Sequence, residues 1–199
     1  ASTSTLTPLT GGDGADVCKM ASTSTSDSLF GGSGSDSFDL SGNVSNSSVE
    51  GGVGEDTFNL GGTLVATSIS GGAGNDSVSV AGTALSSTLV GGSGNDTFVI
   101  NTLSTSYLSG DAGVDSIQIT GALIGSTIDF GSGDEAFTLS VDSTTSTIKG
   151  GLGADTLIFS STLTTSSVAG ESGADMISFA AVLGKDNTID AGAGADTLI

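Results

Sequence analysis

The sequence predicts an all-β solenoid in which about ten coils of 20 residues stack into two parallel sheets lying face to face. Three observations predict this fold. A glycine-rich motif recurs along the whole chain of 199 residues, and apolar residues alternate with other residues on both sides of each motif. In addition, 33 glycines and an abundance of Ser and Thr disfavour helix throughout.

The acid in the sixth place of each motif sets the register of the repeat. Successive acids are separated by 20, 20, 20, 20, 19, 20, 20, 20 and 21 residues. The ten acids are Asp16, Asp36, Asp56, Asp76, Asp96, Asp115, Glu135, Asp155, Asp175 and Asp196. Because these ten repeats fill residues 1–199, we expect a single domain.

The first strand of each coil is expected directly after the acid, where apolar residues stand two and four places on. This period of two indicates a strand with one buried face. The pairs are Phe38 and Leu40, Phe58 and Leu60, Val78 and Val80, Phe98 and Ile100, Ile117 and Ile119, Phe137 and Leu139, Leu157 and Phe159, and Ile177 and Phe179. Cys18 and Met20 hold these places in the first repeat, so we interpret the single cysteine as a small core residue.

A short turn follows, such as SGN at 41–43 or GGT at 61–63, and one turn, Asn101-Thr102, is a residue shorter. It is usually followed by one of the apolar residues Val44, Leu64, Leu103, Leu123, Leu163 and Leu183. The shorter turn accounts for the single 19-residue step.

The second strand is marked by an apolar residue two places before each glycine pair. These residues are Leu9, Leu29, Val49, Ile69, Leu89, Leu108, Ile128, Ile148, Val168 and Ile189. Two places earlier stands a small polar residue: Thr7, Ser47, Thr67, Ser87, Ser106, Ser126, Ser146 or Ser166, with Asp27 and Asn187 as exceptions. We expect these side chains to line the interior and to form hydrogen bonds with neighbouring coils.

One such coil cannot bury its apolar face alone, so the coils must stack. Ten coils at the spacing of neighbouring strands give a flattened rod roughly 48 Å long.

The glycine-rich turn closes each coil and is predicted to bind metal. Its glycines allow positive φ and bring carbonyl oxygens close together, where a side chain would collide. Carbonyls and one carboxylate per turn form a set of hard oxygen ligands, which suits Ca²⁺, whereas zinc would favour the His and Cys that this chain lacks or nearly lacks. The alternative is that glycine only makes the turn and the acid only caps it.

The motifs GGDGAD, GGSGSD, GGVGED, GGAGND, GGSGND and GGLGAD, each followed by an apolar residue two places on, resemble the calcium-binding nonapeptide of the repeats-in-toxin (RTX) family. The resemblance extends over the whole chain. It implies a right-handed parallel β-roll with Ca²⁺ between successive loops. For the loops at 71 and 91, the implied ligands are Gly72, Gly74 and Asp76 from one loop and Gly91, Ser93 and Asp96 from the next, so that each interior acid serves two ions.

The sequence departs from this family by carrying one motif per 20 residues, whereas the usual roll has a calcium turn at both edges. The opposite turns have no matching acid, so we expect a single row of up to nine ions along one edge. The predicted metal residues are the ten acids together with Gly12, Gly14, Gly31, Gly32, Gly34, Gly51, Gly52, Gly54, Gly71, Gly72, Gly74, Gly91, Gly92, Gly94, Gly110, Gly150, Gly151, Gly153, Gly170 and Gly173.

Four loops depart from the motif. Asp111 and Glu171 replace the second glycine in two of them, Ala191 replaces the first glycine in the last, and the loop at 130 begins with Phe130 and ends with Glu135. We expect carbonyl ligation to tolerate most of these changes. Because Phe requires negative φ, Phe130 is expected to impair its own site.

The charge restricts the partners. With 22 acids and only Lys19, Lys149 and Lys185 as cations, the formal net charge is −19, which excludes nucleic acids and anionic membranes as partners. No apolar run is long enough for a membrane helix. Without His and with one buried Cys, no nucleophile and base pair can be assembled, so we predict that the chain is not an enzyme.

We therefore expect a Ca²⁺-binding structural module that stays loose without calcium and stiffens when ions cross-link its rungs. Such open loops indicate dissociation constants of about 10⁻⁴ to 10⁻³ M, which is typical of extracellular modules. The RTX resemblance likewise implies export from Gram-negative bacteria, and a surface layer, filament or adhesin is the expected setting.

The ends suggest self-association. The chain lacks an initiator Met and is expected to be a processed product or an excised piece. Its last half-coil, 191–199, and its first, 1–10, together make 19 residues, so copies placed end to end would continue the roll.

Two alternatives remain. One is ice binding through an outward row of hydroxyls, Ser48, Ser68, Thr88, Thr127, Thr147, Ser167 and Thr188, which Tyr107 interrupts. The other is the calcium-dependent C-terminal repeat region of a secreted enzyme or toxin.

Overall fold

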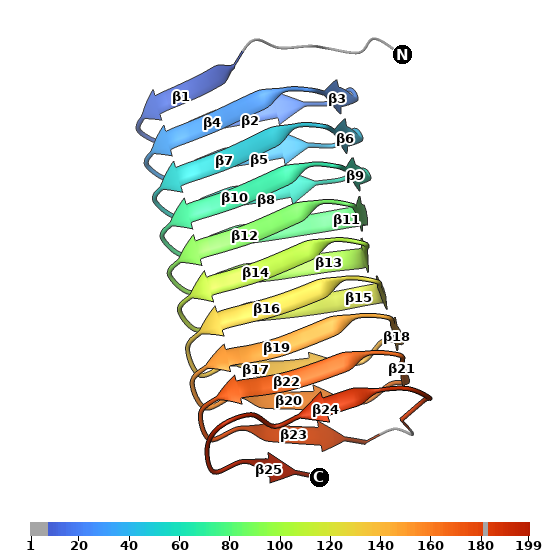
Figure 1. Ribbon diagram of the computed structural model, residues 1–199. Coiled ribbons are helices and arrows are strands. Elements are labelled where there is room, and N and C mark those ends of the chain that lie inside the picture. The colour runs from blue at the N-terminus through green and yellow to red at the C-terminus, as the bar shows by residue number, and fades with distance from the viewer. Residues whose placement is uncertain (1–7, 181–182) are drawn as a thin grey trace.

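A computed structural model describes residues 8–180 and 183–199, which form the predicted stack of parallel strands (Figure 1). Thr7 lies outside the described residues. One face is a ten-stranded sheet whose strands each enter a glycine-rich loop. They are β1 (Leu9–Asp13), β4 (Ser28–Ser33), β7 (Ser48–Val53), β10 (Ser68–Ala73), β12 (Thr88–Ser93), β14 (Tyr107–Ala112), β16 (Thr127–Ser132), β19 (Thr147–Leu152), β22 (Ser167–Ser172) and β24 (Thr188–Asp190).

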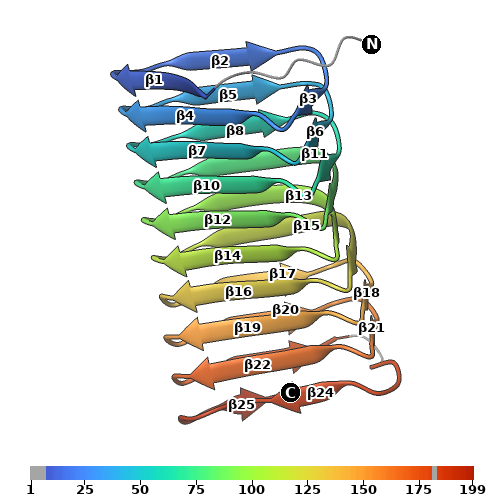
Figure 2. The ribbon, with the colours of Figure 1, turned by 45° about the horizontal axis from the view of Figure 1, so that its top comes forward.

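The opposite face carries the strands that follow the acids, and Figure 2 shows them behind the first sheet. They are β2 (Val17–Met20), β5 (Ser37–Leu40), β8 (Thr57–Leu60), β11 (Ser77–Leu85), β13 (Thr97–Ser104), β15 (Ser116–Ile124), β17 (Ala136–Leu139), β20 (Thr156–Phe159), β23 (Met176–Phe179) and β25 (Thr197–Leu198). The first six belong to one sheet and the last four to another, which continues the stack.

A third, narrow ladder closes the roll at the edge away from the glycine-rich loops. Its two-residue strands are β3 (Ser24–Thr25), β6 (Val44–Ser45), β9 (Leu64–Val65), β18 (Ser143–Thr144) and β21 (Leu163–Thr164). In the middle of the roll the long strands β11, β13 and β15 bend round this edge and supply the ladder with their second halves. The sequence predicted only a turn here.

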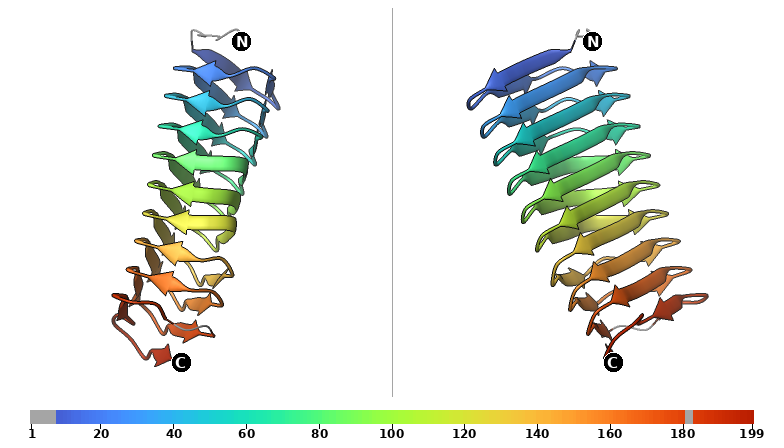
Figure 3. Two further views of the ribbon diagram at one scale, coloured as in Figure 1. Left: turned by 90° about the vertical axis from the view of Figure 1, so that its right-hand side faces the viewer. Right: turned by 60° about the vertical axis from the view of Figure 1, so that its left-hand side comes forward.

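The register confirms the repeat. Each strand pairs in parallel with the equivalent residues one coil on, for example Ile69 with Leu89. Where Asn101-Thr102 is the shorter turn, the pairing of β11 with β13 skips a residue between Val80 and Thr83. The strands of successive rungs keep nearly the same direction along the rod (Figure 3).

The core fills the narrow space between the two faces. The predicted apolar residues of the interior rungs are buried, except that Phe179 is half-buried, whereas Leu9 and Leu183 in the first and last rungs are exposed. Cys18 and Met20 pack against the core as predicted, and burial raises the pKa of the Cys18 thiol. Among the described residues there is no helix, and hence none that could cross a membrane.

The predicted interior hydroxyls are buried as well, and they form a ladder of hydrogen bonds beside the narrow edge. The amide of Ser87 donates to Ser106 Oγ at 2.9 Å, and the amide of Ser106 donates to Ser126 Oγ at 3.0 Å. Asp27 and Asn187 take the same place at the two ends of this ladder.

Candidate metal centre

The glycine-rich loops form a single column along the edge where the strands of the first sheet end, at the left in Figure 1. Successive loops lie one strand spacing apart because the flanking strands pair in register, such as Gly72 with Gly92. The fold therefore places equivalent groups of neighbouring loops directly above one another.

The acids form a hydrogen-bonded ladder inside this column. The amide of Asp76 donates to Asp96 Oδ1 at 2.7 Å, and the amide of Asp96 donates to Asp115 Oδ1 at the same distance. Equivalent bonds join Asp16 to Asp36, Asp36 to Asp56, Asp56 to Asp76, Glu135 to Asp155, Asp155 to Asp175 and Asp175 to Asp196. One carboxylate oxygen of most acids thus faces the preceding loop.

The second carboxylate oxygen has no hydrogen-bond partner. This holds for Oδ2 of Asp16, Asp36, Asp56, Asp76, Asp96, Asp115, Asp155 and Asp175 and for both side-chain oxygens of Glu135. The interior acids from Asp36 to Asp175 are at most 3% exposed. Burying an ionised oxygen without a partner costs free energy of folding, so a column of such oxygens indicates that a cation binds there.

The first glycine of each loop leaves the space in which this oxygen lies. A Cβ on Gly71 would collide with Asp76 Oδ2 and would come within 2.7 Å of the Gly91 carbonyl oxygen. In the loops at 11, 31, 51, 110, 150 and 170, a Cβ on the first glycine would likewise meet the loop's own acid oxygen and the first carbonyl oxygen of the next loop. Two hard oxygens therefore converge between successive loops.

Carbonyls of the second and fourth places point forward, toward the following loop. The carbonyl oxygens of Gly72 and Gly74 lie where a Cβ of Gly92 and of Gly94 would stand. Both places have positive φ, 116° at Gly72 and 133° at Gly74, as the sequence predicted. Positive φ was also expected at the first place, but the first glycines have none, so they are needed for space alone.

The six groups that the RTX resemblance implied as ligands lie on the two sides of the gap between the loops at 71 and 91. Gly72, Gly74 and Asp76 face forward, while the Gly91 carbonyl, the Ser93 carbonyl and Asp96 Oδ1 face back. The Ser93 carbonyl also accepts a 2.7 Å hydrogen bond from the Gly74 amide, so one of its lone pairs is used within the protein.

Comparison with the opposite edge of the roll argues against the alternative that the acid only caps the turn. There, Ser87 and Ser106 accept the amide of the preceding rung with a neutral hydroxyl, and each hydroxyl donates its own proton to a carbonyl. The hydrogen-bonding task at the loop edge could be performed by serine in the same way. The charge and the second oxygen of Asp are therefore in excess of what the turn needs.

Burial and mutual repulsion act on the carboxyl groups. Burial, with a smaller contribution from repulsion by nearby acids, raises the pKa of Asp76 and of Asp96 to about 6. Burial also raises the pKa of Glu135 to about 8, with Asp155 and Asp115 contributing. The protein alone thus disfavours the charged column, which a bound cation would stabilise.

A second polar ladder lies in the fifth place of the loops, and the sequence analysis missed it. The Asn75 and Asn95 side chains accept the amides of the next rung at 2.7 and 2.8 Å, and Asp134 does the same for Ala154. The recurrence of Asn in GGAGND and GGSGND was the signal that could have revealed it.

Within the described residues, no three His, Cys, Asp or Glu side chains gather as a ready metal cluster. Backbone carbonyls dominate each gap instead, with a carboxylate from the loop on either side. Such a set of hard oxygens fits Ca²⁺ better than a soft transition metal.

Comparison with known proteins identifies the repeat. Residues 22–43, 68–83, 81–99 and 183–199 match the RTX calcium-binding nonapeptide repeat, so the chain carries this repeat in four copies. No curated protein matches the sequence.

The fold is also found among solved structures. A crystal structure described as a hyperactive, Ca²⁺-dependent, β-helical antifreeze protein from an Antarctic bacterium superposes with a TM-score of 0.59. The alignment covers 94% of this chain and 84% of that chain at 16% sequence identity. At this identity the likeness concerns the fold, which is a parallel β-solenoid of about nine turns.

Proposed function

We propose that this calcium-binding β-solenoid is a calcium-dependent structural module, in which one row of ions along the loop edge cross-links successive rungs. The observation that carries the proposal is the column of buried carboxylate oxygens without partners. One position lies between each pair of neighbouring loops. Its ligands come from the second and fourth carbonyls and the acid of one loop and from the first and third carbonyls and the acid of the next.

Each interior acid takes part in two positions. Asp96 Oδ1 faces the gap that precedes its loop, and Asp96 Oδ2 lies beside the first glycine, toward the gap that follows. Filling one position therefore orders a carboxylate for the next. Binding along the row is expected to be cooperative and coupled to folding.

We infer that the module works outside the cell or on its surface. Sites built mainly from carbonyls bind Ca²⁺ with dissociation constants of about 10⁻⁴ to 10⁻³ M, which extracellular calcium satisfies and cytosolic calcium does not. The chain would then fold into a stiff rod after export. A surface layer, filament or adhesin is the setting that needs such a rod.

The proposal assigns the module no enzymatic, nucleic-acid-binding or membrane-inserting role. It also includes contact between copies of the chain at the ends of the rod. Leu9 and Val17 are exposed in the first rung, and Leu198 and Ile199 are exposed in the last. Sedimentation in millimolar Ca²⁺ tests this part. A single monomeric species at high concentration would contradict it.

Far-UV circular dichroism during a calcium titration, with reversal by EDTA, tests the proposed function itself. We expect β-sheet signal to appear with Ca²⁺ and to disappear with the chelator. Equal folding in EDTA and in Ca²⁺ would contradict it. Magnesium at the same concentration is the control, because it demands shorter distances and stricter octahedral geometry.

Ice binding is the second candidate, and one structural feature favours it. Ser68, Thr88, Thr127 and Thr147 stand in register on the outer face of the first sheet, at rung spacing. The β-helical structure similar to this chain is described as an antifreeze protein. However, Tyr107 stands within the row and is 38% exposed, so the face is not uniform. Ice-crystal shaping at micromolar protein distinguishes the two functions.

The third candidate, the repeat region of a secreted enzyme or toxin, would use the same calcium chemistry. It differs only in what is attached to the rod. Calcium-dependent activity of the parent protein would support it.

A further inference from the structure

The inference concerns the loop at 130–135, which departs from the motif at both ends of its sequence, and it rests on the proposed function. In the other interior loops the first place is glycine and the acid is Asp. Here they are Phe130 and Glu135, and the structure shows what the two changes do together.

Phe130 fits the backbone of the loop. The first places of the other loops do not have positive φ, and neither does Phe130, so the residue introduces no strain there. This corrects the expectation that its φ requirement would impair the site. The relevant difference is volume, because the first place is where a Cβ would meet the acid's second oxygen in the other loops.

The phenyl ring of Phe130 occupies the interior side of the loop. Its side chain is 0% exposed, and its ring centroid lies 5.2 Å from that of Phe137 on the opposite face. Phe137 contacts Phe159 at 6.4 Å, and Phe159 stacks on Phe179 at 5.2 Å. An aromatic series thus runs through these rungs beside the loop column.

Glu135 is displaced from the place that Asp takes elsewhere. Its Oε1 lies against Gly133, in the fourth place of the loop, whereas Asp Oδ2 lies against the first place in the other loops. Neither of its side-chain oxygens accepts a well-formed hydrogen bond, in contrast to Asp115 Oδ1, although the Asp115 amide still lies close enough to lower the pKa of Glu135. The Cβ of Phe130 stands at the place that the second oxygen of Asp takes in the other interior loops.

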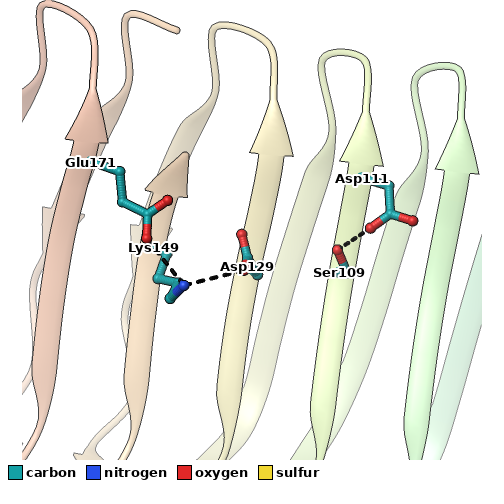
Figure 4. A network of polar contacts seen from close by, with 5 residues as sticks. All are labelled: Ser109, Asp111, Asp129, Lys149 and Glu171. Atoms are coloured by element: carbon teal, nitrogen blue, oxygen red, sulfur yellow. Dashed lines mark hydrogen bonds and ion pairs between the residues drawn. The ribbon is translucent and has the colours of Figure 1, made fainter. Parts of the chain in front are cut away.

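The outer face has a compensating feature at the same rungs. Lys149 Nζ lies 3.6 Å from Asp129 Oδ2 and 3.0 Å from Glu171 Oε1, so one ammonium group links β16, β19 and β22 (Figure 4). Glu171 also replaces a glycine of a loop and has a positive φ of 75°. Here a cation of the protein itself joins three consecutive rungs.

We propose that the row of calcium positions is interrupted between the loops at 130–135 and 150–155, where the side chain of Phe130 takes the space of the acid's second oxygen and so removes a ligand of the ion. This joint is held instead by the aromatic series and, on the outside, by Lys149. The roll then carries six positions before the joint and two after it. The sequence alone predicted up to nine positions and expected Phe130 to impair its own site through its φ, not through its volume.

The count of bound ions tests the proposal, measured on the full chain by native mass spectrometry and by equilibrium dialysis with ⁴⁵Ca²⁺. The double variant Phe130→Gly/Glu135→Asp restores the motif and is expected to bind one ion more than the wild type. The converse variant Gly71→Phe/Asp76→Glu is expected to bind one fewer. Phe130→Leu keeps an apolar side chain and should leave the count unchanged.

Anomalous scattering from wild-type crystals grown with Ca²⁺ or Tb³⁺ gives a direct answer that needs no variant to fold. We expect peaks between the other neighbouring loops and none between the loops at 130 and 150. A peak in that gap, or equal counts for the wild type and Phe130→Gly/Glu135→Asp, would overturn the proposal. Peaks in every gap would leave the proposed function standing, whereas no bound ion at all would remove both.

Discussion

The amide nitrogen of Asp76 donates a 2.7 Å hydrogen bond to Oδ1 of Asp96, one rung further along the roll, while Oδ2 of both acids remains buried without a partner. One oxygen of each carboxylate thus accepts the amide of the preceding rung, and the other has no protein partner and is available to bind a cation. Because the pattern repeats along the column, the edge is a one-dimensional array in which neighbouring positions share their acids.

Replacing one shared acid should weaken two calcium positions together. Asp76→Asn keeps an oxygen for the Asp56 amide but removes the charge, so we expect at least about tenfold weaker Ca²⁺ binding at the two adjoining gaps. Isothermal titration calorimetry measures this. Glu50→Gln removes the same charge from an exposed residue outside the loops and is the control. A loss confined to a single position would contradict the sharing of acids.

Filling the space at a first glycine should remove a position without changing charge. A Cβ in Gly71→Ala would collide with Asp76 Oδ2, so the carboxylate must shift away from the Gly91 carbonyl. We expect loss of one bound ion and about 1 to 3 kcal/mol lower stability in Ca²⁺. Ion counting and thermal unfolding check this, with the neighbouring Ser70→Ala as the control. An unchanged count would show that the first place need not be small.

The pH dependence should reverse sign between the calcium-free and calcium-bound protein. Without metal, the folded-state pKa of Asp76 and Asp96 is raised to about 6, above the ordinary value of 3.8. Their contribution to stability is therefore complete below pH 4 and is lost as the pH rises through 6, and that of Glu135 is lost as the pH rises through about 8. We expect the melting temperature in EDTA to fall between pH 4 and 8.

In Ca²⁺ the opposite trend is expected, because the metal binds the deprotonated carboxylates. Melting temperatures at fixed calcium should rise from pH 5 to pH 7. The double variant Asp76→Asn/Asp96→Asn should flatten both slopes. Similar slopes in EDTA for this variant and the wild type would show that other charges cause the trend.

The hydroxyl ladder at the opposite edge should matter for stability and not for calcium binding. Ser106→Ala leaves the Ser87 amide, which now donates to Ser106 Oγ at 2.9 Å, buried without a partner. We expect a loss of about 1 to 3 kcal/mol in the free energy of unfolding in saturating Ca²⁺. The calcium-binding isotherm of this variant should be the same as that of the wild type. Ser106→Thr retains the hydroxyl, as Thr67 does in its own rung, and should restore most of the stability.

A column of left-handed residues precedes this ladder and offers a stabilising change. Ala66 has a φ of 49°, and Gly125 occupies the equivalent place in another coil. Ala66→Gly should relieve the steric cost and raise stability by a few tenths to about 1 kcal/mol. Ser68→Gly, in the extended strand β10, should lower it, which provides the matched comparison by thermal unfolding.

The sequence by itself determined the coil. The 20-residue spacing of the acids, the apolar pairs such as Phe98 and Ile100, and the small polar residues such as Ser106 predicted strands, interior and stacking, because one coil cannot bury its own face. The sequence also predicted the 19-residue coil with the shorter turn at Asn101-Thr102, because one missing residue shifts the register of the neighbouring strands.

Only the tertiary structure decided what each group in the loop does. Whether an aspartate oxygen is free depends on which amide lies across the gap, and the Asp76 to Asp96 bond joins residues 20 apart in sequence. The role of the first glycine, the fifth-place ladder and the place of the Phe130 ring follow from distances between rungs. A one-dimensional repeat defines the rung, but the contacts between rungs exist only once the rungs are stacked.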